Sequence, residues 1–257
     1  MLMMRDFTTN SRLLTLLQTI EDTLGQGIHA TLIPEKHNLV AEGYSVNISG
    51  EIPTFLYTPG KKVPEDILCH ELMHLVLYIE GFPGFGIPTF IEEDQVEYQV
   101  LSMVYHISLH LKVWELTEKF GFSESSRYDS NIMAELIPRV EARVLLTGDW
   151  PELVRAGVAT YLANGLLCPC AEATKARLRE AAKKSYPQFV ELTDAICQVY
   201  EKSLPLSPKS CCEGVLATLR LIGAPIGYLR PEFLSHPHPG FLASVEAMAQ
   251  QHQGQTK

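Results

Sequence analysis

The chain has 257 residues, a formal net charge of −9 at pH 7 and 46% hydrophobic residues. This length allows one or two globular domains with a substantial core, and the acidic balance argues against general nucleic-acid binding. The sequence has no apolar run of about eighteen residues, and residues 1–10 lack the basic-then-apolar pattern of a signal peptide. We therefore expect no membrane segment, a cytoplasmic protein, and six cysteines that stay reduced.

The first quarter of the chain predicts one helix followed by short strands. Apolar residues recur at helical spacing over 13–24, and Gly25 or Gly27 is a suitable end for this helix. Runs rich in β-formers follow at 28–33, 44–48 and 52–57. Because proline cannot donate to a strand ladder, Pro53 predicts that the third run lies at a sheet edge.

A strong chemical signal stands at residues 70–74, where His70, Glu71 and His74 form an H-E-x-x-H pattern. Two histidines four residues apart on a helix lie one turn apart on the same face, so both rings can reach one metal ion. The glutamate beside them can hold and deprotonate a metal-bound water. The pattern predicts a metal site in which Glu71 is the general base.

The helix that carries this pattern is predicted to be central and buried. Pro64 suits its first turn and Gly81 suits its end. Apolar residues cover all its sides between these two positions, which is typical of a helix surrounded by other elements. Buried histidines need partners for their ring nitrogens, and a metal ion is one such partner.

A second long helix after residue 91 offers further metal ligands. Its apolar stripe steps by four, three, four and three residues through Val100, Val104, Ile107, Leu111 and Trp114. Extending this stripe backward reaches Glu97 and then Glu93. Carboxylates on an inward face need a partner, so either glutamate is a candidate third ligand.

These features together resemble the gluzincin metallopeptidases, in which a glutamate on a second helix follows H-E-x-x-H. Eighteen residues separate His74 from Glu93, as in aminopeptidase-type members. The resemblance implies that His70, His74 and Glu93 bind Zn²⁺ and that Glu97 orients a zinc histidine. The Asn-Glu dipeptide of those members is missing at the third ligand, so the aminopeptidase reaction does not carry over. The layout is also similar to the small intracellular ImmA/IrrE-like proteases.

The remaining sequence predicts connections and helices. The segment 81–88 is rich in glycine and proline and predicts a loop. From about residue 122 the pattern is helical, with Pro138 expected to kink one helix. We expect an α+β fold with a zincin-like core over 1–120, containing a small edge sheet and the active-site helix. A helical subdomain over 121–235 and a flexible tail over 236–257 would follow.

The sequence thus predicts a zinc-dependent metalloendopeptidase that acts on a peptide or protein, without nucleic-acid or membrane partners. One alternative keeps the enzyme but uses Glu97 as the third ligand. In another, the protein holds zinc structurally, or has lost turnover, and acts as a regulatory binding module. A chance H-E-x-x-H in a helical interaction protein would bind no metal. The sequence does not indicate the oligomeric state.

Overall fold

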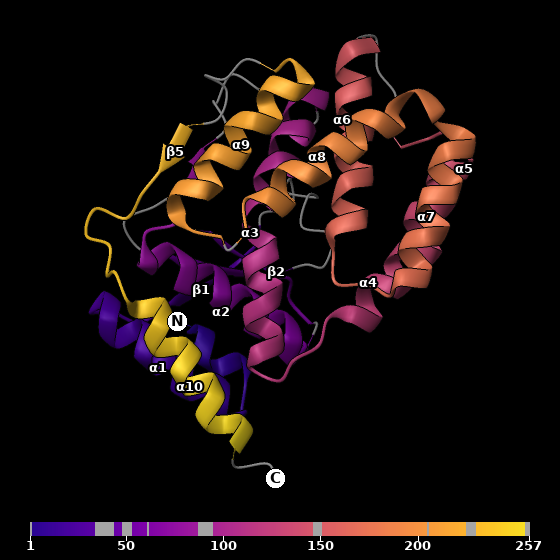
Figure 1. Cartoon of the computed structure of the whole chain (residues 1–257). Helices are drawn as coiled ribbons and strands as arrows, with labels where there is room; N and C mark the ends of the chain where they lie inside the picture. The colour runs from indigo at the N-terminus through magenta and orange to yellow at the C-terminus, as the bar shows by residue number, and fades with distance from the viewer. Residues whose placement is uncertain are drawn as a thin grey trace. The chain divides into compact units, whose positions relative to one another are not determined.

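The computed structural model has a mixed α and β fold in which helices predominate (Figure 1). It describes residues 2–33, 44–47, 53–60, 62–86, 95–145, 151–204, 206–224 and 230–254. Among these residues, no helix combines the length and the apolar character needed to cross a membrane. The expected α+β class is confirmed at this level.

The chain divides into two compact units, and each is built from separate stretches of sequence. The first unit contains residues 1–84, 115–123 and 232–257. The second contains residues 85–114 and 124–231. The segment predicted from the sequence as a tail includes the helix α10 (Phe241–Gly254) and belongs to the first unit.

The first unit begins with a short 3-10 helix, η1 (Met4–Phe7), and the helix α1 (Ser11–Leu24). The side chain of Asn10 accepts the backbone N–H of Arg12 at 3.0 Å and so caps the start of α1. Gly25 ends α1 in the left-handed region, with φ of 69°. The predicted helix and its glycine stop are confirmed.

Three strands form the sheet of this unit, in the order β1-β3-β2. They are β1 (His29–Leu32), β2 (Tyr44–Asn47) and β3 (Thr54–Tyr57), and β3 pairs parallel to β1 and antiparallel to β2. The prediction that the third strand lies at the edge is wrong, because β3 is the middle strand. Pro53 precedes the first paired residue, Thr54, so its missing N–H leaves the ladder intact.

The central helix of this unit is α2 (Glu65–Glu80). Pro64 precedes it at the cap position, and Gly81 ends it with φ of 104°. It packs against α1, β2 and α10, and its residues from Ile67 to Tyr78 are buried except for His74, which is half-buried. The prediction of a buried helix with apolar residues on all sides is confirmed.

The second unit consists mainly of helices. Residues 96–114 of α3 (Val96–Lys119) belong to it, and Val100, Val104 and Ile107 of the predicted stripe are buried. The chain continues through α4 (Ser125–Asn131), the π-helix η2 (Ile132–Leu136) and α5 (Ile137–Glu141). Because Pro138 has no N–H to donate to the preceding turn, the regular α-helical ladder is interrupted here, as the sequence predicts.

The helix α6 packs against both α7 and α8, and α8 packs against α9. These elements are α6 (Pro151–Leu167), α7 (Glu172–Ser185), the 3-10 helix η3 (Pro187–Phe189), α8 (Val190–Lys202) and α9 (Pro208–Ile222). The apolar faces of α6, α7 and α8 form one core with residues of α3, α4 and α5. The buried residues Val215 and Leu219 of α9 pack in a second cluster against α3. The helical character predicted from residue 122 onward is confirmed for the helices from α4 to α9.

The segment predicted as a loop over 81–88 contains a short strand, β4 (Gly84–Gly86). It pairs with β5 (Arg230–Glu232) in a two-stranded sheet. The loop prediction is therefore wrong for these three residues. The sequence did not indicate this strand because two of its three residues are glycine, which is depleted in strands and favoured in turns.

Candidate metal centre

The helix α2 brings the two histidines of the H-E-x-x-H pattern together. The Nε2 atoms of His70 and His74 lie 3.3 Å apart. Their ring centroids are 5.0 Å apart and the ring planes meet at 65°. Both rings therefore direct the same nitrogen at one point beside the helix, as the spacing of four residues predicts.

This separation fits two ligands of one tetrahedral zinc ion. Zinc binds imidazole nitrogen at about 2.0–2.1 Å, so two such nitrogens at a tetrahedral angle stand about 3.3 Å apart. The observed Nε2–Nε2 distance of 3.3 Å matches that value. His70 is also buried, with 7% of its surface exposed, which favours coordination by the neutral ring.

A third histidine, His110 of α3, is oriented by its own helix. Its Nδ1 lies 2.5 Å from the backbone carbonyl oxygen of His106. Because a carbonyl can only accept, Nδ1 carries the proton and the Nε2 of the neutral ring keeps its lone pair. The ring of His106 stacks on that of His110, with centroids 3.4 Å apart and planes 19° apart. These contacts resemble the way in which proteins orient histidine ligands of metals.

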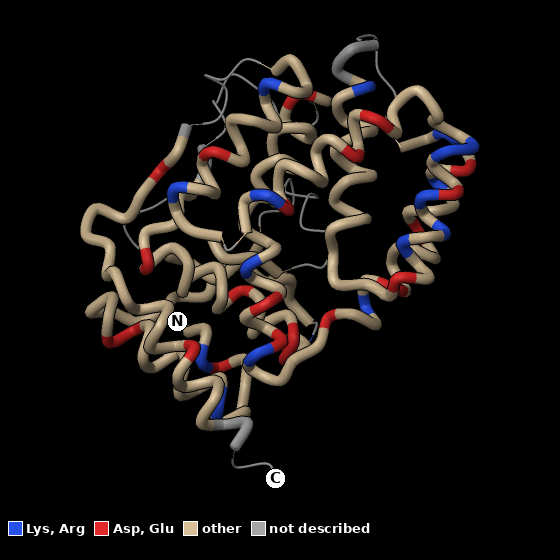
Figure 2. Tube along the Cα trace, viewed as in Figure 1, with Lys and Arg blue, Asp and Glu red and all other residues tan. Residues whose placement is uncertain are grey.

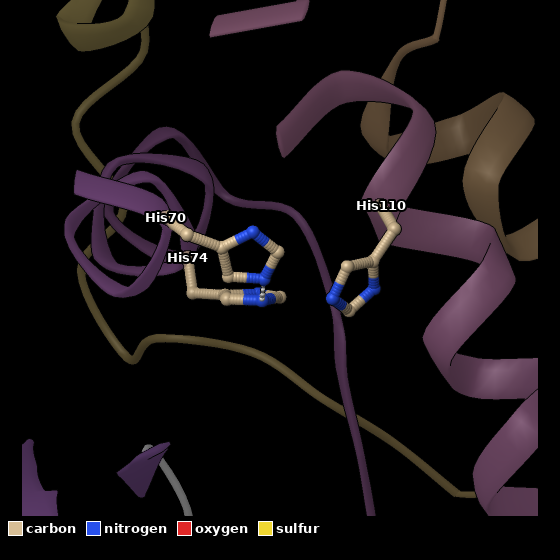
Figure 3. Close-up of side chains that lie close together, drawn as sticks. All are labelled: His70, His74 and His110. Atoms are coloured by element: carbon tan, nitrogen blue, oxygen red, sulfur yellow. Dashed lines mark hydrogen bonds between the residues drawn. The ribbon is translucent and has the colours of Figure 1, made fainter. Parts of the chain in front are cut away.

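His70, His74 and His110 form a group that can hold a metal ion (Figure 3). Each offers one ligand atom, and the three atoms lie within 4.8 Å of one another. Among the residues that the structure describes, no other three histidine, cysteine or acidic side chains meet this condition. The expectation of a metal-binding group is confirmed to this extent, whereas the kind of metal is not shown.

Glu71 lies next to His70 on α2 and is held by the sheet. Its Oε2 accepts the backbone N–H of Val46 in β2 at 2.7 Å, and only 8% of the residue is exposed. β2 is an edge strand, so its outward N–H groups have no strand partner in the sheet. The carboxylate satisfies one of these groups and is thereby oriented by the strand.

The predicted third ligand, Glu93, lies outside the described residues. Glu97 is half-buried in the first turn of α3 and is not part of the three-histidine group. Its predicted role in orienting a zinc histidine stays a prediction, as does Glu93 as a ligand.

The sequence interpretation missed His110, although a signal was present. His110 follows Ile107 by three residues and precedes Trp114 by four, so it lies along the apolar stripe that reaches Glu97. A histidine at such a position is buried, and only 5% of His110 is exposed. The apolar stripe that leads backward to Glu97 thus also indicates His110 as a candidate ligand in the forward direction.

All six cysteines are free thiols, as expected, and five of them are buried. Burial raises the pKa of Cys168 and Cys170, which disfavours the thiolate form that metals bind.

We compared the chain with models of protein families, with curated proteins and with solved structures. None of these comparisons gave a match. The functional argument consequently depends on the site itself, and above all on the two histidines and the glutamate of α2.

Proposed function

We propose that this protein is a zinc-dependent peptidase with a zincin-like core in which His70 and His74 bind the metal and Glu71 is the general base. The observation that carries the proposal is the 3.3 Å separation of the two Nε2 atoms beside a buried glutamate on the same helix. Nitrogen ligands of this kind suit zinc. His110 is our preferred third ligand among the described residues because it belongs to the same group.

The chemistry assigned to each residue follows from its position. A zinc ion held here would polarise the substrate carbonyl and increase the acidity of water. Glu71 would take the proton from the attacking water and then give it to the leaving amine. The hydrogen bond from Val46 to Oε2 orients the carboxylate that we assign to this proton transfer.

One observation also favours the alternative of a metal-holding regulatory protein without turnover. The bond from Val46 to Glu71 links α2 to β2, so this glutamate has a structural role whether or not the protein is an enzyme. In that alternative the site would still bind zinc, but Glu71 would serve the fold alone. Metal content and hydrolysis must therefore be measured separately.

The first experiment measures zinc by plasma mass spectrometry in the purified wild type and in single variants. We expect about one zinc per chain, lost in His70→Ala, His74→Ala and His110→Ala and kept in Glu71→Gln. Glu93→Ala and Glu97→Ala test the two carboxylates as ligands. His238→Ala is the matched control, because this exposed histidine lies outside the group. A wild type without zinc after reconstitution would refute the proposal.

The second experiment follows the hydrolysis of an unfolded protein substrate by the zinc-loaded chain. Glu71→Gln should keep its zinc and lower the rate by about 10²-fold or more, because the amide cannot accept the proton. A zinc-loaded wild type that cleaves no member of a peptide library would support the regulatory alternative. Equal rates in the wild type and in Glu71→Gln would contradict the assigned general base.

A further inference from the structure

The second unit contains a pocket that is unrelated to the residues of the metal centre. Its volume is about 300 Å³, and residues of α6, α7 and α8 line it. Pockets that bind small molecules have volumes from about 300 Å³ upward, so this one is large enough for a small organic ligand.

The buried residues that line the pocket are mainly apolar. Leu162 and Leu166 stand one turn apart on α6, and Leu178 comes from α7. All three leucines are buried. Thr193 of α8 is the polar residue among the buried ones, and its hydroxyl donates to the backbone carbonyl of Phe189. A ligand here therefore meets mainly hydrocarbon.

The outer part of the pocket carries two positive charges and one negative charge. Arg179 and Lys183 of α7 are four residues apart and therefore lie on the same side of the helix, and both are exposed. Asp194 of α8 also lines the pocket and is exposed. The excess of positive charge favours an anionic head group on the ligand.

Two other cations of α7, Lys175 and Arg177, are already paired with carboxylates. Lys175 pairs with Glu172, and Arg177 pairs with Glu141 and Glu180. In the described part of the chain, neither Arg179 nor Lys183 has a carboxylate oxygen within 4.0 Å. Figure 2 shows positive charges recurring along α7. Arg179 and Lys183 are the cations of α7 that line the pocket, and both can contact a ligand there.

We propose that this pocket binds a medium-chain carboxylate, with the hydrocarbon chain against the leucines of α6 and α7 and the carboxylate between Arg179 and Lys183. A medium-chain carboxylate combines a hydrocarbon chain for the leucines with an anionic group for the two cations. Decanoate is therefore the probe, and acetate, which has the same head group without the chain, is its control.

The test is isothermal titration of decanoate into the full-length, zinc-loaded protein. We expect saturable binding of decanoate and none of acetate at the same concentrations. Arg179→Gln and Lys183→Gln should each weaken binding by about tenfold, since each removes one charge-assisted contact. Asp194→Asn should strengthen binding, because it removes the repulsive carboxylate.

Two further variants separate this site from general attraction to a basic helix. Lys184→Gln is the matched control, because Lys184 is exposed on α7 but does not line the pocket, and it should bind decanoate like the wild type. Ala182→Leu places a larger side chain in the pocket lining and should abolish binding while the melting temperature confirms folding. No saturable binding by the wild type, or equal losses in Lys184→Gln and Lys183→Gln, would overturn the proposal.

Discussion

Glu71 accepts a hydrogen bond from outside its own helix, and this bond fixes the orientation of its carboxylate. Val46 donates to one carboxylate oxygen at 2.7 Å. A side chain that is fixed in this way loses little further freedom when it meets a substrate, which is an advantage for a general base. The same bond explains why a buried carboxylate is tolerated beside two histidines.

At the residue scale, the buried thiols predict how stability responds to alkaline pH. Burial raises the pKa of Cys197 and of Cys211 from 9.0 to about 12. Below pH 9 both thiols are protonated in the folded and unfolded states. Above pH 9 the unfolded chain releases these protons first, so the free energy of unfolding falls until the folded pKa is reached.

We expect each of these thiols to lower the free energy of unfolding by up to about 1.4 kcal/mol per pH unit between pH 9 and 12. The measurement is urea unfolding at pH 8 and at pH 10 in a phosphine reductant, for the wild type and for a Cys197→Ala, Cys211→Ala double variant. The double variant should lose less stability between the two pH values. Equal losses would show that these two thiols do not govern the response.

At the element scale, the junction of α2 and α10 is held by Glu80. Its two carboxylate oxygens accept the backbone N–H groups of Gly240 at 3.1 Å and of Leu242 at 2.7 Å. These groups open α10, whose first N–H groups have no partner within the helix. Glu80 therefore caps one helix from the last residue of another.

We expect Glu80→Ala to lower the free energy of unfolding by about 1 kcal/mol, because it leaves these N–H groups to water. Glu80→Gln should lose less, since its amide keeps one acceptor oxygen. Urea unfolding measures both changes, and hydrogen exchange of the Leu242 amide reports whether the start of α10 has opened. Wild-type stability and exchange in Glu80→Ala would contradict this role.

The strand order shows why the presence of a strand is easier to predict than the strands with which it pairs. The three runs of β-formers indicate three strands, which the structure contains. Their order depends on pairing between residues far apart in the sequence, such as Ala30 with Phe55 and Val46 with Phe55. The position of Pro53 just outside the ladder allows β3 to be central, and local sequence does not distinguish this from an edge position.

At the scale of the whole molecule, a bound metal should stabilise the fold. The α2 helix brings His70 and His74 together, so a zinc ion held by them would bind the folded state in preference to the unfolded chain. We expect a chelator to lower the melting temperature and added zinc to restore it. At 100 times the dissociation constant, zinc would contribute about 2.7 kcal/mol.

Differential scanning calorimetry of the chelated and zinc-loaded protein checks this expectation. His74→Ala should remove most of the response to zinc, while His238→Ala should keep it. A zinc response of equal size in His74→Ala would mean that the stabilising ion is bound at other residues.

The local features of the metal centre could be predicted because a helix relates residues by short sequence distances. A spacing of four residues places His70 and His74 on one face, and apolar residues on all sides make α2 a central helix. His110, the bond from Val46 to Glu71 and the central position of β3 could not be predicted in this way. Each joins segments that are distant in the sequence, and such contacts are set by how the whole chain packs rather than by the periodicity of any one segment.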